Sequence, residues 1–140
     1  MVNLKQNFTK KFTFAKKSSI SWDEFVLLAS EAAKKYHFPA NVLICQAALE
    51  CARGTSLMAR TKNNYFGFMA YDNNPGKAKQ YQTALDSIID YLELVTNSPR
   101  YAAVKKCKTP LETIQAIKTA GYATDPLYVQ KITSLKEWTS

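Results

Sequence analysis

An almost wholly apolar run at residues 38–52 constrains the fold of this chain more than any other feature. Its composition predicts a helix buried among other elements. The run carries a single charge, Glu50, close to its end. Because burying a carboxylate is costly unless the group is paired, Glu50 is expected in one of three settings: in an ion pair, at the floor of a cleft, or in solvent at the helix end. In an apolar cleft its pKa would rise, as a general acid requires.

The rest of the chain predicts further helices, because helix-start signals and apolar positions at helical spacing recur along it. Ser21 with Glu24, and Thr109 with Glu112, form capping boxes. Only 4 Gly and 5 Pro occur, which argues against a turn-rich β fold. Residues 65–82 are rich in aromatic rings and predict a loop or small hairpin. The sum is an all-α domain with helical segments expected at about 21–36, 39–54, 55–60, 84–97, 99–106, 109–121 and from 125 onward.

The chain has 140 residues, enough for one core, and a net charge of +8 with a pI of about 9.4. Residues 1–20 are predicted to be a basic N-terminal arm that docks partly through Phe8, Phe12 and Phe14, and residues 21–140 to be the folded domain. The charge favours anionic partners such as nucleic acid, anionic membranes or bacterial wall polymers. A solvated arm without a specific partner explains the same charge. No helix-turn-helix with a basic recognition helix is evident, so nucleic acid is not expected as a partner.

Several classes of protein are excluded by what the sequence lacks. No apolar run reaches the roughly 18–20 residues of a membrane span. The first residues contain no apolar signal core, so the chain is expected to be made in the cytoplasm without a Sec signal. The odd set of Cys45, Cys51 and Cys107 argues against a disulfide framework. With His37 as the one histidine, neither a metal site nor a cofactor is expected.

Polar side chains cluster around the end of the apolar run. Gln46 and Glu50 lie four residues apart and therefore share a helix face, as the wall of a cleft would require. Residues 63–66, Asn-Asn-Tyr-Phe, follow shortly afterwards. Amides can bond sugar hydroxyls and rings can stack on pyranoses, so this combination suits a glycan. The alternative is that the rings belong to the core and that the Asn pair forms a turn.

Four motifs in order resemble the lysozyme-like peptidoglycan glucosaminidases of glycoside hydrolase family 73, which includes flagellar muramidase domains. Residues 47–56, AALECARGTS, resemble the stretch around the catalytic Glu of that family, and residues 63–67, NNYFG, resemble its NNLFG element. Residues 86–91 and 98–104 are similar to its middle helix and following RY element. Residues 121–128, GYATDPLY, match its GYATDPxY signature.

This resemblance implies a lysozyme-like helical domain with a short aromatic lobe that cleaves the β-1,4 glycan backbone of peptidoglycan as an endo-N-acetylglucosaminidase. Glu50 would be the general acid, Tyr122 would lie near the scissile bond, and Asn64 with its two successors would shape the cleft floor. Arg100 could be structural or functional. The side chains expected to bind substrate are Gln46, Asn64, Tyr65, Phe66, Tyr71 and Tyr122.

The sequence departs from the family in its short segment 68–82, where the family has a longer lobe with a second carboxylate. Asp72 is the only acid in that segment and is the candidate for activating water. Three alternatives stay open: assistance by the substrate N-acetyl group, a lytic transglycosylase with Glu50 as acid and then base, and a glycan-binding module without activity. A monomer acting on the cell wall is expected. The lack of a signal and of wall-binding repeats is consistent with a phage lysin, a virion or secretion-machine component, or an enzyme exported by other means.

Overall fold

The computed structural model describes residue 8 and residues 10–70 and 77–139. Within these residues all regular elements are helical, which confirms the all-α prediction, and none is long and apolar enough to cross a membrane. The helices are η1 (Thr13–Lys16), α2 (Trp22–Lys35), α3 (Ala40–Cys51), α4 (Leu57–Lys62), α5 (Ala84–Asn97), η2 (Pro99–Lys106), α6 (Pro110–Thr119), α7 (Tyr128–Thr133) and η3 (Lys136–Thr139).

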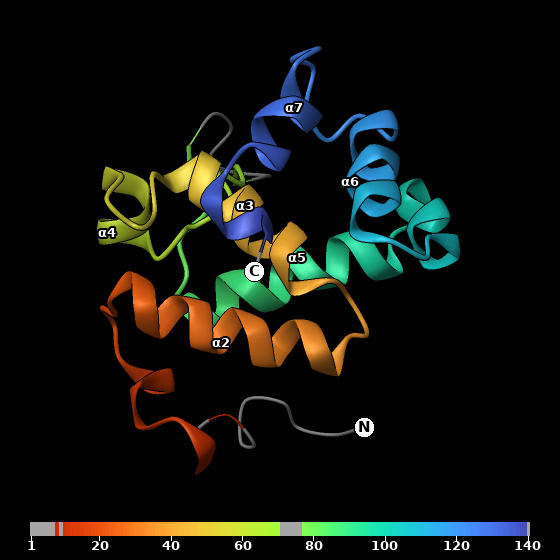
Figure 1. The fold of residues 1–140 in the computed structure, drawn as a ribbon. Coiled ribbons are helices and arrows are strands. Elements are labelled where there is room, and N and C mark those ends of the chain that lie inside the picture. Colours follow the sequence, from red (N-terminus) through yellow and green to blue (C-terminus); the bar gives the residue numbers. More distant parts are fainter. Residues whose placement is uncertain (1–7, 9, 71–76, 140) are drawn as a thin grey trace.

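Helix α3 is the apolar run and forms the centre of the molecule. Eight of its 12 residues are buried. Figure 1 shows it in the middle of the fold, with α2 on one side and α7 on the other. The helix ends at Cys51, earlier than the predicted end near Gly54, because Ala52 and Arg53 adopt left-handed conformations with φ of 49° and 53°. Glu50 therefore lies in the last turn of the helix, one residue before its end.

Both predicted capping boxes are confirmed. Ser21 Oγ accepts a hydrogen bond from the Glu24 amide at 3.1 Å, and the Glu24 carboxylate accepts one from the Ser21 amide at 2.9 Å. Thr109 and Glu112 repeat this reciprocal pair at the start of α6. Each box satisfies amide groups that have no partner within the helix, which fixes where α2 and α6 begin.

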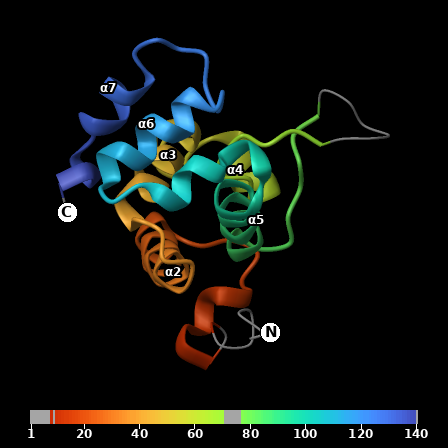
Figure 2. The same cartoon turned by 90° about the vertical axis from the view of Figure 1, so that its right-hand side faces the viewer.

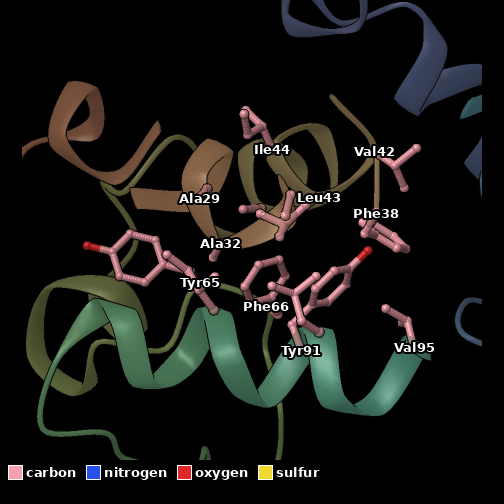
Figure 3. Packing of buried hydrophobic residues seen from close by; sticks show 14 of the residues in the cluster. Ala29, Ala32, Phe38, Val42, Leu43, Ile44, Tyr65, Phe66, Tyr91 and Val95 are labelled. Carbon is pink, nitrogen blue, oxygen red and sulfur yellow. The ribbon is translucent and has the colours of Figure 1, made fainter. Parts of the chain in front are cut away.

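Stacked aromatic rings join the segment after α4 to the helices around it. The Phe25 ring of α2 lies between Trp22 and Tyr65, with centroid distances of 4.9 and 4.3 Å. Phe66 stacks on Tyr91 of α5 at 4.3 Å, and Figure 3 shows these two rings side by side above α5. These ring contacts hold the segment between α2 and α5.

The described part of the N-terminal segment packs beneath α2, on the side away from α6 and α7 (Figure 2). Phe8 is only 1% exposed, and Phe12 and Phe14 pack against the same core. Lys11 Nζ lies 3.0 Å from the Glu31 carboxylate of α2. The three phenylalanines therefore dock this segment, as predicted.

The aromatic segment before α5 forms the base of a small hairpin that projects from the helical body (Figure 2). Met69 and Ala78 form an isolated antiparallel bridge. The Lys79 amide donates to the Phe68 carbonyl at 2.8 Å. Residues 71–76 lie outside the described residues.

Candidate active site

A cleft of about 500 Å³ opens beside the last turn of α3. Glu50 of α3 lies on one side of the cleft, and the segment after α6 forms the facing wall together with α7. Residues on this wall come from the GYATDPLY motif, so the cleft joins two motifs that are far apart in the sequence. The lining residues are Leu49, Glu50, Tyr122, Ala123, Thr124, Asp125, Tyr128 and Lys131.

The Glu50 carboxyl is unpaired within the described part of the chain, where no Lys or Arg side chain forms a salt bridge with it. The residue is exposed to the cleft, but surrounding protein atoms partly desolvate its carboxyl and raise its pKa. Burial raises the pKa of Tyr122 and of Tyr128, and the nearby Glu50 charge adds to both shifts. Of the three settings expected for Glu50, the structure shows the cleft.

The backbone of the NNYFG segment comes close to this carboxyl. A Cβ placed on Gly67 would lie 3.6 Å from Glu50 Oε2, and Gly67 has a φ of +73°. The left-handed conformation favours glycine here, whereas 3.6 Å is an ordinary van der Waals contact. Gly67 therefore forms part of the floor beside the acid.

Asn64 holds this floor in place from beneath. Its side chain is fully buried and makes four hydrogen bonds to the backbone. Its amide nitrogen donates to the carbonyls of Phe68 and Lys79 at 2.8 and 2.9 Å. Its oxygen accepts from the amides of Gly67 and Phe68 at 2.9 and 3.2 Å. Asn64 thus shapes the floor from within the protein.

Three predicted substrate contacts need correction because the side chains are turned into the protein. Asn64 is 0% exposed, and Tyr65 and Phe66 are each 3% exposed. Tyr65 and Phe66 instead complete the ring stacks with α2 and α5. These residues support the cleft floor and offer a glycan almost no side-chain surface.

Gln46 needs the same correction. Its side chain is fully buried, donates to the Tyr128 hydroxyl at 3.0 Å and accepts a hydrogen bond from the Tyr91 hydroxyl. Gln46 therefore ties α3 to α5 and α7. It holds the Tyr128 wall of the cleft from behind.

Replacing Gln46 with Ala should lower the free energy of unfolding by about 2–4 kcal/mol, because both tyrosine hydroxyls lose their buried partner. Urea denaturation measures this change. The matched control is Gln115→Ala on the exposed face of α6, expected within about 0.5 kcal/mol of the parent. Equal effects of the two substitutions would contradict the structural role of Gln46.

Tyr122 lines the cleft, as the resemblance implied. Its ring lies 6.3 Å from Tyr91 and 6.2 Å from Tyr128. Its hydroxyl is buried, and no described protein group forms a hydrogen bond with it. Tyr122 thus brings an aromatic surface to the wall facing Glu50, while its hydroxyl is buried.

Arg100 has a structural role. Its guanidinium donates to the carbonyls of Ala120 and Gly121 at 2.7 and 2.9 Å. Gly121 has a φ of +96°, and a Cβ there would lie 2.5 Å from Arg100 Nη2. Arg100 and Gly121 together fix the turn that delivers Tyr122 to the cleft.

The remaining predicted site residues, Tyr71 and Asp72, lie outside the described residues. Asp125 lines the cleft, but its carboxylate is engaged by Lys131 at 2.6 Å and by the Leu127 amide at 2.9 Å. Lys131 also lines the cleft but was not predicted from the sequence. Its spacing of one helical turn from Tyr128 on α7 could have indicated that the two residues share a face. No three His, Cys, Asp or Glu side chains within the described ranges could share a metal ion.

An unpaired carboxylic acid in an aromatic-walled cleft of a helical domain is the arrangement of lysozyme-like glycoside hydrolases. A model of the glucosaminidase family, described as mannosyl-glycoprotein endo-beta-N-acetylglucosaminidase, matches residues 26–138. The chain belongs to this family.

Similar proteins include peptidoglycan hydrolase FlgJ of Salmonella typhimurium, 32% identical over 133 residues, covering 78% of this chain and 42% of FlgJ. Exo-glucosaminidase LytG of Bacillus subtilis is 32% identical over 127 residues, covering 74% of this chain and 45% of LytG. The glycoside hydrolase domain of Salmonella typhimurium FlgJ superposes with a TM-score of 0.64 at 30% identity, covering 82% of this chain and 86% of that domain. The chain spans less than half the length of these two curated relatives.

Proposed function

We propose that this domain hydrolyses the β-1,4 glycan backbone of peptidoglycan as an endo-N-acetylglucosaminidase, with Glu50 as the general acid. The observation that carries this proposal is the unpaired Glu50 carboxyl, whose raised pKa keeps it protonated at higher pH than an ordinary glutamate. The names of the relatives, a peptidoglycan hydrolase and an exo-glucosaminidase, support the substrate class.

In this mechanism Glu50 donates its proton to the glycosidic oxygen as the bond from that oxygen to the sugar C1 breaks. The partly exposed Tyr122 ring forms the aromatic surface against which the sugar lies, and Tyr128, only 3% exposed, packs against that ring. Water then attacks C1 and completes hydrolysis. Asp72 is our candidate for activating that water, since the described carboxylate on the far wall, Asp125, is held by Lys131.

The same proposal places the site of action outside the cytoplasm, on the cell wall, with the domain working as a monomer. A phage lysin or a virion or secretion-machine component would meet this substrate. The net charge of +8 supports adhesion to an anionic wall.

The test is mass spectrometry of purified peptidoglycan after digestion by the folded protein. Reducing N-acetylglucosamine ends are expected. Anhydromuramic ends would show that the domain is a lytic transglycosylase and not a hydrolase. Asp72 would then have no water to activate. Absence of any product would overturn the enzymatic proposal and leave a glycan-binding module.

A further inference from the structure

A second, smaller groove of about 130 Å³ lies between the hairpin and α5. Its lining residues are Phe68, Met69, Lys79, Asp90 and Leu94. We propose that this groove binds the free amino-carboxylate end of a diamino dicarboxylic acid side chain in the peptide attached to the glycan, and so selects peptide-bearing strands. This inference rests on the proposed function and adds a specificity site to it.

The groove borders the catalytic cleft. Gly67 lies against the Glu50 carboxyl, and the next residue, Phe68, already lines the groove. The Phe68 ring also lies 6.4 Å from the Tyr122 ring of the cleft wall. A substituent on a sugar bound beside Glu50 can therefore reach the groove directly.

The groove combines an apolar floor with one charge of each sign. Phe68, Met69 and Leu94 supply the apolar surface. Lys79 Nζ lies 2.8 Å from Asp90 Oδ2, and the two side chains are 42% and 34% exposed. Because both charges reach solvent, a ligand can contact each of them.

These features fit one kind of occupant. The space is about 130 Å³ against about 500 Å³ in the cleft, so it suits a side chain better than a further sugar unit. N-Acetylglucosamine carries no charge, whereas the free end of a diamino dicarboxylic acid carries an ammonium and a carboxylate on an aliphatic chain. The carboxylate would pair with Lys79, the ammonium with Asp90, and the chain would lie on the apolar floor.

The Lys79–Asp90 pair can open to admit this ligand at little cost. Partly exposed ion pairs contribute only about 0–1 kcal/mol to folding. When Lys79 turns to the ligand, Asp90 keeps the hydrogen bond that it accepts from the Tyr81 hydroxyl at 2.5 Å. The backbone of Lys79 also stays fixed, through its bonds to Phe68 and Asn64.

The first test compares cleavage of uncrosslinked peptidoglycan before and after an amidase removes its peptides. The parent protein should cleave the peptide-bearing strands about tenfold faster. Lys79→Met, which keeps the aliphatic stem, should bring this ratio close to one. The control is Lys77→Met, an exposed lysine of the same hairpin outside the groove, which should keep the parent ratio. A parent ratio of one, or an unchanged ratio in Lys79→Met, would overturn the inference.

The second test does not depend on cleavage. The free peptide, carrying a diamino dicarboxylic acid with both charged groups, is titrated into the folded protein while the Met69 methyl resonance is followed by NMR. A saturable shift is expected for the parent, and none for Lys79→Met. Absence of a shift in the parent would overturn the inference even where glycan is cut, whereas a shift without any cleavage would refute only the proposed function.

Discussion

Glu50→Gln should lower the rate of peptidoglycan cleavage by about 100- to 10,000-fold, the usual contribution of a general acid. Gln has nearly the same shape as Glu but has no proton to give to the glycosidic oxygen. The measurement is the release of glycan fragments at matched protein concentration. Asp23→Asn removes an exposed carboxylate of α2 outside the cleft and should keep the parent rate. A Glu50→Gln variant with more than about a tenth of the parent rate would contradict the role of Glu50.

The pH dependence of the cleavage rate is a second test of the role of Glu50. Desolvation raises the pKa of Glu50 above its ordinary value of 4.5, so the acid stays protonated at higher pH. Cleavage by the parent should fall as the pH rises through this raised pKa. The residual activity of Glu50→Gln should lack this decline, which distinguishes loss of an acid from a general distortion of the cleft.

Glu50→Gln should also be at least as stable as the parent near neutral pH. The raised pKa means that the folded protein binds the Glu50 proton more tightly than the unfolded chain does. The parent therefore loses stability as the pH rises above the unfolded value of this group, and the variant does not. The difference in unfolding free energy should favour the variant at neutral pH and vanish in acid. A variant that is less stable at neutral pH would show that the charge stabilises the fold.

The helices could be predicted from the sequence because their signals are local. The capping boxes at Ser21 and Thr109 place the starts of α2 and α6 where the structure has them. The predicted end of α3, near Gly54, was wrong because Ala52 takes a left-handed conformation usually found at Gly or Asn. Such an ending depends on the surrounding packing and leaves no mark in the sequence.

The candidate site could be predicted only in part. Motifs identified Glu50 and Tyr122, and both line the cleft. The spacing of Gln46 and Glu50 indicates a shared face, but Gln46 is covered by Tyr128, which lies 82 residues away in the sequence. Helical periodicity shows which residues share a face, whereas tertiary packing decides which part of that face stays open.

Asn64→Ala is the second substitution for which we expect a large effect. It removes four buried hydrogen bonds to the backbone of the cleft floor. Since each buried group left without a partner costs about 1–3 kcal/mol, the free energy of unfolding should fall by about 3–5 kcal/mol. Cleavage by the protein that remains folded should fall about 100-fold, because Gly67 would shift beside Glu50. Urea denaturation and fragment release measure the two effects.

Two further variants separate hydrogen bonding from the mere loss of a side chain. Asn97→Ala removes an exposed asparagine from the end of α5 and should change the unfolding free energy by no more than about 0.5 kcal/mol.

Asn64→Asp keeps the acceptor for the amides of Gly67 and Phe68 but cannot donate to the carbonyls of Phe68 and Lys79 when ionised. Burial beside those carbonyls would raise the pKa of the new carboxyl in the folded state. The Asp variant should therefore regain stability as the pH falls, because its protonated form can again donate one hydrogen bond. A stability difference from the parent that does not change with pH would show that the donated bonds of Asn64 do not hold the floor.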